Sequence, residues 1–164
     1  MRCAALAERL RQRGIAVRFV CRSLEGSLEA LLRERGHDVT MLPAPQAATS
    51  AAADGDYAAW LGVPESVDAG ETAAALAGMR PDWLVVDHYA LDAAWEEPLR
   101  ATCRRLLVID DLANRPHKAD LLLDQNLGRT PQHYSGLLPA TARVLTGPYY
   151  ALMRDDFAKW RERA

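Results

Sequence analysis

Three short polar clusters contain most of the side chains in this sequence that could do chemistry. They are Asp87-His88-Tyr89, Asp110-Asp111 with Asn114 nearby, and Asp124-Gln125-Asn126. His88 and Tyr89 are the candidates best able to move a proton or to polarise an oxygen near neutral pH. What the clusters can do together depends on whether the fold brings them to one place.

Each cluster directly follows an apolar run of the kind that forms a buried parallel strand, at residues 83–86, 105–109 and 119–123. In an open α/β sheet, ligands bind beyond the carboxyl ends of the strands, and these ends lie along one edge. We therefore expect the three clusters to meet in one crevice.

A purely structural role is the alternative for each cluster, because Asp and Asn after a strand often cap the next helix or form a turn. A single cluster favours that role, whereas three clusters in register favour a ligand site. Asp110 and Asp111 do not indicate a metal centre, because consecutive residues on a strand point to opposite faces and cannot easily share one ion.

The elements that must position these clusters alternate between strand and helix. Besides the three strands above, we predict strands at residues 17–21, 38–42 and 144–145, and helices at residues 1–13, 28–36, 67–79 and 92–99. The order predicts an α/β fold with a Rossmann-like parallel sheet covered by helices on both faces. Residues 46–55 are predicted to form a surface excursion without chemistry.

The composition is that of one globular domain in the cytoplasm. The chain has 164 residues, 49% hydrophobic and 26% charged, with a net charge of −2. This charge predicts no binding to nucleic acid or to an anionic membrane surface. No apolar run approaches the ~18 residues of a membrane span, and there is no signal peptide. The odd number of cysteines, Cys3, Cys21 and Cys103, indicates reduced thiols in the core.

The other aromatic and imidazole side chains are assigned structural places. We expect the tryptophans to pack inside the protein, and the remaining histidines to lie in turns or on the surface. These residues are Trp60, Trp83, Trp95 and Trp160, and His37, His117 and His133.

The sequence opens inside a helix, with Cys3, Leu6 and Leu10 on one face and Gly14 as a stop. The strand and Gly-rich turn that usually open an α/β domain are therefore expected to be missing. A start assigned at an internal methionine, or a gene fragment, is the favoured explanation. A true shortened product would instead leave unpaired backbone groups on the strands beside the gap.

Together with flanking motifs, the clusters resemble the UDP-2,4-diacetamido-2,4,6-trideoxy-β-L-altropyranose hydrolases, the nucleotide-sugar hydrolases of pseudaminic acid biosynthesis. The resemblance runs nearly end to end along the chain and rests on the order and spacing of the motifs. The matching segments are Met1-Arg2-Cys3, residues 24–28, 82–89 and 109–115, His117, and residues 124–126 and 147–154.

The resemblance implies the N-terminal half of a GT-B-like architecture. Residues 1–147 would form the sugar-side domain, without its first strand, and residues 148–164 would lead to a UDP-binding domain absent from this chain. The implied reaction is hydrolysis, with inversion, of the bond between the anomeric carbon and the UDP oxygen, without metal or cofactor. The expected partner is a UDP-sugar.

The resemblance also implies the roles of individual residues. Tyr89 matches a functional tyrosine of the family and is assigned to catalysis with His88, and Arg2 lies at the mouth of the same crevice. The sugar is expected to contact Arg2, Asp87, Asp110, Asn114 and Asn126. The family's activating histidine stands in a G-x-G-H turn two residues before the position of Met1, so this chain is expected to be inactive alone.

Two further functions stay open at this point. One is a glycosyltransferase acceptor domain of the GT-B type, resembling the lipid II-forming enzymes, although the sequence has no basic, apolar face for docking to a membrane. The other is a non-catalytic sugar-binding module derived from a degenerate half-enzyme.

Overall fold

The structure is a computed structural model that describes residues 1–46, 57–154 and 157. Strands and helices alternate over residues 2–109, as predicted, whereas the next strand follows without a helix before it. The strands are β1 (Arg18–Arg22), β2 (Asp38–Leu42), β3 (Trp83–Val86), β4 (Arg105–Ile109), β5 (Leu121–Asp124) and β6 (Arg143–Thr146). The α-helices are α1 (Arg2–Gln12), α2 (Glu29–Glu34), α3 (Glu65–Ala75) and α4 (Ala93–Leu99), with short 3₁₀ helices at Tyr57–Trp60, Arg100–Thr102, Pro131–Tyr134 and Pro148–Tyr150.

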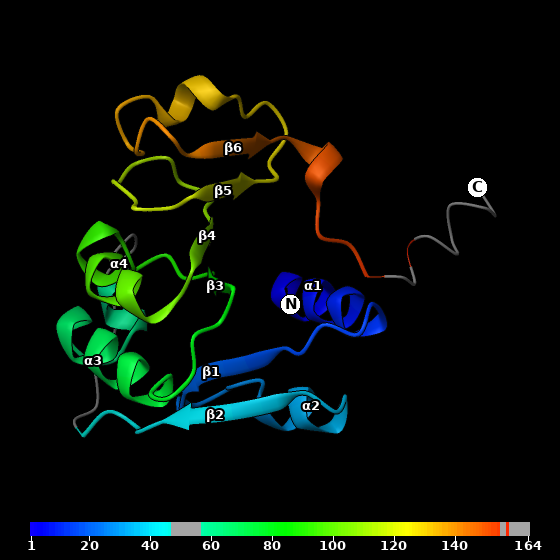
Figure 1. The fold of residues 1–164 in the computed structure, drawn as a ribbon, viewed down its shortest axis with the longest axis vertical. Helices are drawn as coiled ribbons and strands as arrows, with labels where there is room; N and C mark the ends of the chain where they lie inside the picture. Colours follow the sequence, from blue (N-terminus) through cyan, green and yellow to red (C-terminus); the bar gives the residue numbers. More distant parts are fainter. Residues whose placement is uncertain (47–56, 155–156, 158–164) are drawn as a thin grey trace.

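All strand pairs are parallel, which confirms the α/β class and the Rossmann-like order (Figure 1). Strands β3, β4, β5 and β6 form one sheet in that order, and β1 pairs with β2 in a second sheet. Because the four strands of the larger sheet run the same way, their carboxyl ends share one edge. The residues that follow β3, β4 and β5 are therefore neighbours in space.

The strands form two sheets and not one. In the described part of the chain, β1 has no ladder to β3, and the break falls where a further central strand is expected. Helix α1 reaches across this break: Ala4 packs with Leu32 and Val39 beside the small sheet, while Arg2 reaches the end of β3.

The main core lies between the larger sheet and helices α3 and α4. Leu106 and Val108 of β4 pack with Trp95 and Leu99 of α4, and these four side chains are between 0% and 4% exposed. Helix α4 begins at Asp92, whose carboxylate accepts a hydrogen bond of 2.7 Å from the N–H of Ala94, as an N-cap residue does. This helix thereby supports the turn that carries His88 and Tyr89.

A buried charge network joins the small sheet to the helices of the larger one. Arg22 of β1 donates to Asp68 Oδ2 through Nε (3.0 Å) and Nη2 (2.6 Å), and it pairs with Glu71. The Trp95 indole N–H donates to the other oxygen of Asp68 at 2.8 Å. The side chains of Arg22 and Asp68 are 4% and 7% exposed, so each charge depends on its partners.

Several local predictions are wrong. His37 is buried and packs edge-on against Phe19, and His117 is buried with its Nδ1 2.7 Å from Glu96 Oε1. In both cases a neighbour from another part of the chain covers the imidazole. His133 lies exposed in a turn, as predicted.

The tryptophans divide into two groups. Trp95 packs in the core as predicted, whereas Trp60 and Trp83 are 53% and 40% exposed, so the prediction is wrong for these two. Trp160 lies outside the described residues, as does most of the predicted excursion at 46–55. The helix predicted at 67–79 is shorter and spans Glu65–Ala75. The strand predicted at 119–123 is β5, which begins at Leu121 and not at Ala119.

The three cysteines are free thiols, with Cys103 buried and Cys3 and Cys21 half-buried. Across the described residues, no helix combines the length and the apolarity needed to cross a membrane.

Candidate functional site

A pocket of about 390 Å³ opens beyond the carboxyl end of β3. Its lining residues come from three separate segments of the chain: Met1, Arg2, Trp60, Asp87, His88 and Tyr89. Asp87 directly follows Val86, the last residue of β3, so the strand itself delivers the polar cluster to this edge. This position is where open α/β sheets bind ligands.

Arg2 lies between two carboxylates and holds them together. Its Nε and Nη2 donate to Asp87 Oδ1 at 3.0 and 2.7 Å, and its Nη1 donates to Asp111 Oδ2 at 2.6 Å. Burial opposes the charge on Arg2, but hydrogen bonds to Asp87 and Asp111 and their negative charges raise its pKa overall. The three side chains are 14–23% exposed. Helix α1 is therefore fastened to the sheet edge by a charged triad with one excess negative charge.

Cys3 strengthens this attachment. Its Sγ lies 3.2 Å from Asp87 Oδ2, the oxygen that Arg2 does not use. Burial and the negative charge of Asp87 raise the pKa of Cys3 to about 12, so the thiol stays protonated and donates a hydrogen bond to the carboxylate. Cys3 is a structural hydrogen-bond donor and not a thiolate nucleophile.

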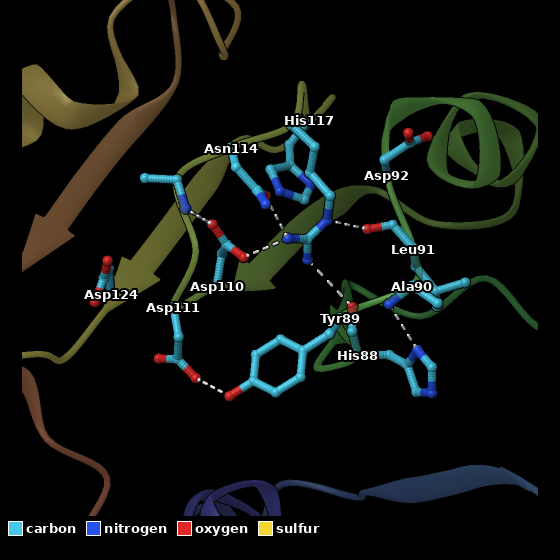
Figure 2. A network of polar contacts seen from close by, with 12 residues as sticks. His88, Tyr89, Ala90, Leu91, Asp92, Asp110, Asp111, Asn114, His117 and Asp124 are labelled. Atoms are coloured by element: carbon cyan, nitrogen blue, oxygen red, sulfur yellow. Dashed lines mark hydrogen bonds and ion pairs between the residues drawn. The ribbon is translucent and has the colours of Figure 1, made fainter. Parts of the chain in front are cut away.

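Tyr89 points its hydroxyl at Asp111, one member of this triad (Figure 2). The hydroxyl donates to Asp111 Oδ2 at 2.7 Å, and this hydrogen bond, together with burial, raises the pKa of Tyr89. The phenol therefore stays protonated at neutral pH, with its proton committed to Asp111. The phenol oxygen can still accept a hydrogen bond, so it can bind a water molecule or a ligand hydroxyl.

His88 presents a donor to its surroundings. The backbone N–H of Ala90 donates to Nδ1 of His88 at 3.1 Å, so in the neutral ring the proton is on Nε2 (Figure 2). Burial lowers the pKa of His88, while the negative charges of Asp68 and Asp87 oppose this effect. A neutral imidazole with a free Nε2–H polarises a ligand oxygen; it is not poised to accept a proton at that nitrogen.

The lowered pKa of His88 predicts how stability changes with pH. The folded protein binds the His88 proton less readily than the unfolded chain, so stability from this site is complete above about pH 6.5 and is lost as pH falls through the folded pKa. We expect His88→Gln to lose less stability than the parent between pH 7.5 and pH 5.5, measured by urea unfolding. His133→Gln, at an exposed histidine, is the control. Equal losses for the parent and His88→Gln would contradict the assignment.

Asp110 and Asp111 point in different directions, as consecutive residues of a strand end do (Figure 2). Asp110 is fully buried and accepts a 2.8 Å hydrogen bond from the Ala113 N–H. It also pairs with Arg115 at 2.9 Å, and although burial opposes it, this hydrogen bond and this charge lower the pKa of Asp110. Ala113 has a φ of 53°, rare for a residue with a side chain. Asp110 thus holds the loop after β4 in a fixed shape.

The two predicted asparagines differ in their relation to the pocket. Asn126 donates its Nδ2 to Asp111 Oδ1 at 3.2 Å and is therefore connected to Tyr89 through one carboxylate. Asn114 is exposed, and its Oδ1 lies 3.3 Å from Nη1 of Arg115, on the side of the loop that faces Asp110.

The structure therefore brings together Arg2, Asp87, His88 and Tyr89 at one pocket. Asn126 is linked to Tyr89 through the carboxylate of Asp111. Asp110 and Asn114 do not line this pocket, so a direct sugar contact by either stays a prediction. Residues that the sequence analysis did not assign to the site are Cys3, Trp60 and Asp111. For Asp111, its place in the polar cluster after β4 was a signal, and for Cys3 its place in the matching segment Met1-Arg2-Cys3 was one. For Trp60 the sequence carries none.

In the part of the chain that the structure describes, no group of three or more His, Cys, Asp or Glu side chains is arranged to hold a metal ion.

The fold and the position of the pocket define this chain as an α/β protein of Rossmann-like order with a candidate ligand site at the carboxyl edge of its sheet. No known family model matches the sequence. It is 35% identical over 75 residues to the UDP-2,4-diacetamido-2,4,6-trideoxy-β-L-altropyranose hydrolase of Campylobacter jejuni subsp. jejuni serotype O:2. The matched stretch covers 45% of this chain and 27% of that relative, which is shorter than the end-to-end resemblance expected from the motifs.

Proposed function

We propose that this chain is the sugar-side domain of a nucleotide-sugar hydrolase that uses water to remove UDP from UDP-2,4-diacetamido-2,4,6-trideoxy-β-L-altropyranose. The observation that carries the proposal is the meeting of His88, Tyr89 and Arg2 at one pocket beyond β3. The similarity to a hydrolase that is named for this substrate supports the same reaction class.

The polar groups of the pocket suit a sugar more than a diphosphate. His88 offers an N–H donor for a carbonyl or hydroxyl oxygen, and the phenol oxygen of Tyr89 offers an acceptor for a hydroxyl. The two carboxylates of Asp87 and Asp111 more than neutralise the positive charge of Arg2, so the triad supplies no net positive potential for a leaving diphosphate. The proposal therefore assigns the diphosphate to a separate UDP-binding domain, in a GT-B-like arrangement with residues 148–164 as the connection.

The same hydrogen bonds favour a base for water activation that comes from outside these pocket residues. Both oxygens of Asp87 already accept hydrogen bonds, from Arg2 and from Cys3. His88 has Nδ1 occupied by the Ala90 N–H. We therefore assign the base to a segment outside residues 1–164, corresponding to the G-x-G-H turn of the hydrolases that this chain resembles. The absence of a ladder between β1 and β3 in the described part of the chain supports a further strand between them, which would carry this turn.

Calorimetric titration tests the sugar-side assignment with the chain as it exists. We expect the free 2,4-diacetamido-2,4,6-trideoxy-L-altrose to bind, and UDP to bind much more weakly or not at all. His88→Ala is expected to weaken sugar binding, because it removes the Nε2–H donor. His133→Ala, far from this pocket in sequence and exposed, is the control. A chain that prefers UDP, or that binds neither compound, would contradict the proposal.

Turnover tests the reaction itself. We expect the chain alone to release UDP from the UDP-sugar at the background rate. A protein extended by the G-x-G-H strand and by the UDP-binding domain should release it catalytically. Sugar binding without UDP release by the extended protein would support a binding module instead, and transfer of the sugar to another acceptor would support a glycosyltransferase.

A further inference from the structure

Trp60 lies at the pocket with about half of its surface in water. It is 53% exposed and lines the same pocket as His88 and Tyr89. The 3₁₀ helix Tyr57–Trp60 brings it there, although it is 29 positions away from Tyr89 in the sequence.

Two tyrosines hold the indole in place. The ring of Tyr57 meets Trp60 edge to face, with centroids 5.0 Å apart and an interplanar angle of 84°. Tyr57 also contacts Tyr89 at 5.1 Å, and Trp60 lies 6.0 Å from Tyr89. The edge-to-face arrangement of Tyr57 and Trp60 is a favourable one for an aromatic pair, and the two contacts with Tyr89 are tilted but within the usual range of distances. The three rings therefore form an aromatic cluster that continues directly into the Tyr89–Asp111 hydrogen bond.

Trp60 and Trp95 differ in how much of each side chain is exposed to water. Trp95 is 4% exposed and its N–H donates to Asp68, which makes it an ordinary core residue. Trp60 leaves apolar surface in water beside polar groups, and burial of that surface by a ligand would be favourable. The pocket thus combines one apolar wall with the donor of His88 and the acceptor of Tyr89, which is the composition of a small-molecule site.

We propose that Trp60 is the platform on which the apolar part of an N-acetylated deoxy sugar packs, and that it selects such sugars over ordinary hexoses. This inference rests on the proposed function. The name of the sugar specifies two acetamido groups and a deoxygenated C6, so the molecule carries three methyl groups. An apolar wall accommodates these methyl groups, while the Nε2–H of His88 is available for an acetamido carbonyl. An ordinary hexose offers hydroxyl groups at these positions, so it buries less apolar surface on the indole.

Titration of the chain with the free 2,4-diacetamido-2,4,6-trideoxy-L-altrose tests the inference, by calorimetry and by tryptophan fluorescence. We expect Trp60→Ala to weaken binding on the order of tenfold or more, since aromatic contacts of this size contribute about that factor. Trp60→Phe should lie between Trp60→Ala and the parent. The emission change on sugar binding should also be reduced in Trp60→Phe, where the reporter is missing.

Trp83→Ala is the matched control. Trp83 is also exposed, at 40%, but it lies at the start of β3 in a hollow lined by Arg80, Asp82, Arg104 and Arg105. Its replacement should leave sugar affinity unchanged. Circular dichroism establishes that each variant is folded before its titration is compared, and the Phe variant replaces Trp60→Ala if the latter does not fold.

The outcomes separate this inference from the proposed function. If the parent binds the sugar and both Trp60 variants bind it with the same affinity, the platform is overturned while the hydrolase proposal stands. If the parent binds a plain hexose as tightly as the diacetamido sugar, the selectivity is overturned. If the parent binds no sugar, the proposed function fails and the inference fails with it.

Discussion

Replacing Asp68 with alanine is expected to lower the free energy of unfolding by about 3–5 kcal/mol, because it leaves a buried guanidinium without its main partner. Arg22 and Asp68 are 4% and 7% exposed, and the same carboxylate accepts the indole N–H of Trp95. Alanine therefore removes the acceptor of both the Arg22 guanidinium and the Trp95 indole N–H inside the protein. Glu71 keeps one contact to Arg22, but it cannot reach both groups in the way that Asp68 does.

Urea unfolding and thermal melting measure this effect. For a domain of this size, the expected loss corresponds to a fall in melting temperature of about 6–20 °C. Asp38→Ala is the matched control, since Asp38 pairs with Arg18 at 2.6 Å on the surface, with 54% and 42% of the two side chains exposed. An exposed pair contributes about 1 kcal/mol or less. Similar losses for the two variants would show that the Arg22 network is not the junction between the sheets.

Glu96→Ala is the second substitution with a large expected effect, a loss of about 2–6 kcal/mol of unfolding free energy. The Glu96 carboxylate is fully buried; one oxygen lies 2.7 Å from His117 Nδ1, and the other accepts the backbone N–H of Lys118. Alanine leaves two donors without an acceptor, and each unsatisfied buried donor costs about 1–3 kcal/mol. Because residues 117 and 118 end the loop that carries Asn114 and Arg115, this loop should also become more mobile.

The neighbouring residue supplies the control for this experiment. Glu97 pairs with the side-chain amine of Lys118 at 3.0 Å, but its carboxylate is 62% exposed. Glu97→Ala should change the unfolding free energy by no more than about 0.5 kcal/mol, as surface substitutions usually do. Both variants remove one glutamate side chain. A difference between their free energies of unfolding in urea therefore reports the burial of Glu96 and not the loss of a charge. Equal stability of the two variants would be evidence against a structural role for the Glu96–His117 pair.

The larger sheet could be predicted because its strands are short apolar runs with polar residues directly after them. The bounds of β3 and β4 agree with the predicted residues 83–86 and 105–109, and the carboxyl-end rule placed His88 and Tyr89 at a pocket. These features depend on local pattern and on the general geometry of parallel sheets, and both can be read from residue types.

Other features depend on contacts between distant segments, which a single sequence does not contain. His117 is buried because Glu96, 21 positions earlier, covers its ring nitrogen. Trp60 lies at the pocket because its short 3₁₀ helix lies against Tyr89, 29 positions later in the chain. An isolated histidine or tryptophan has no pattern of its own, so the most common environment of its residue type was assigned, and for these two it was wrong.

The attachment of α1 has a consequence for how occupation of the pocket would spread through the molecule. Arg2 contacts Asp87 and Asp111, which lie 85 and 109 positions further along the chain. Helix α1, which carries Arg2, can therefore move away from the segments after β3 and β4 without any break in a helix or a strand. A bound molecule that touches both would oppose that separation, so amide hydrogen exchange should slow in the first turn of α1 and after β4 together.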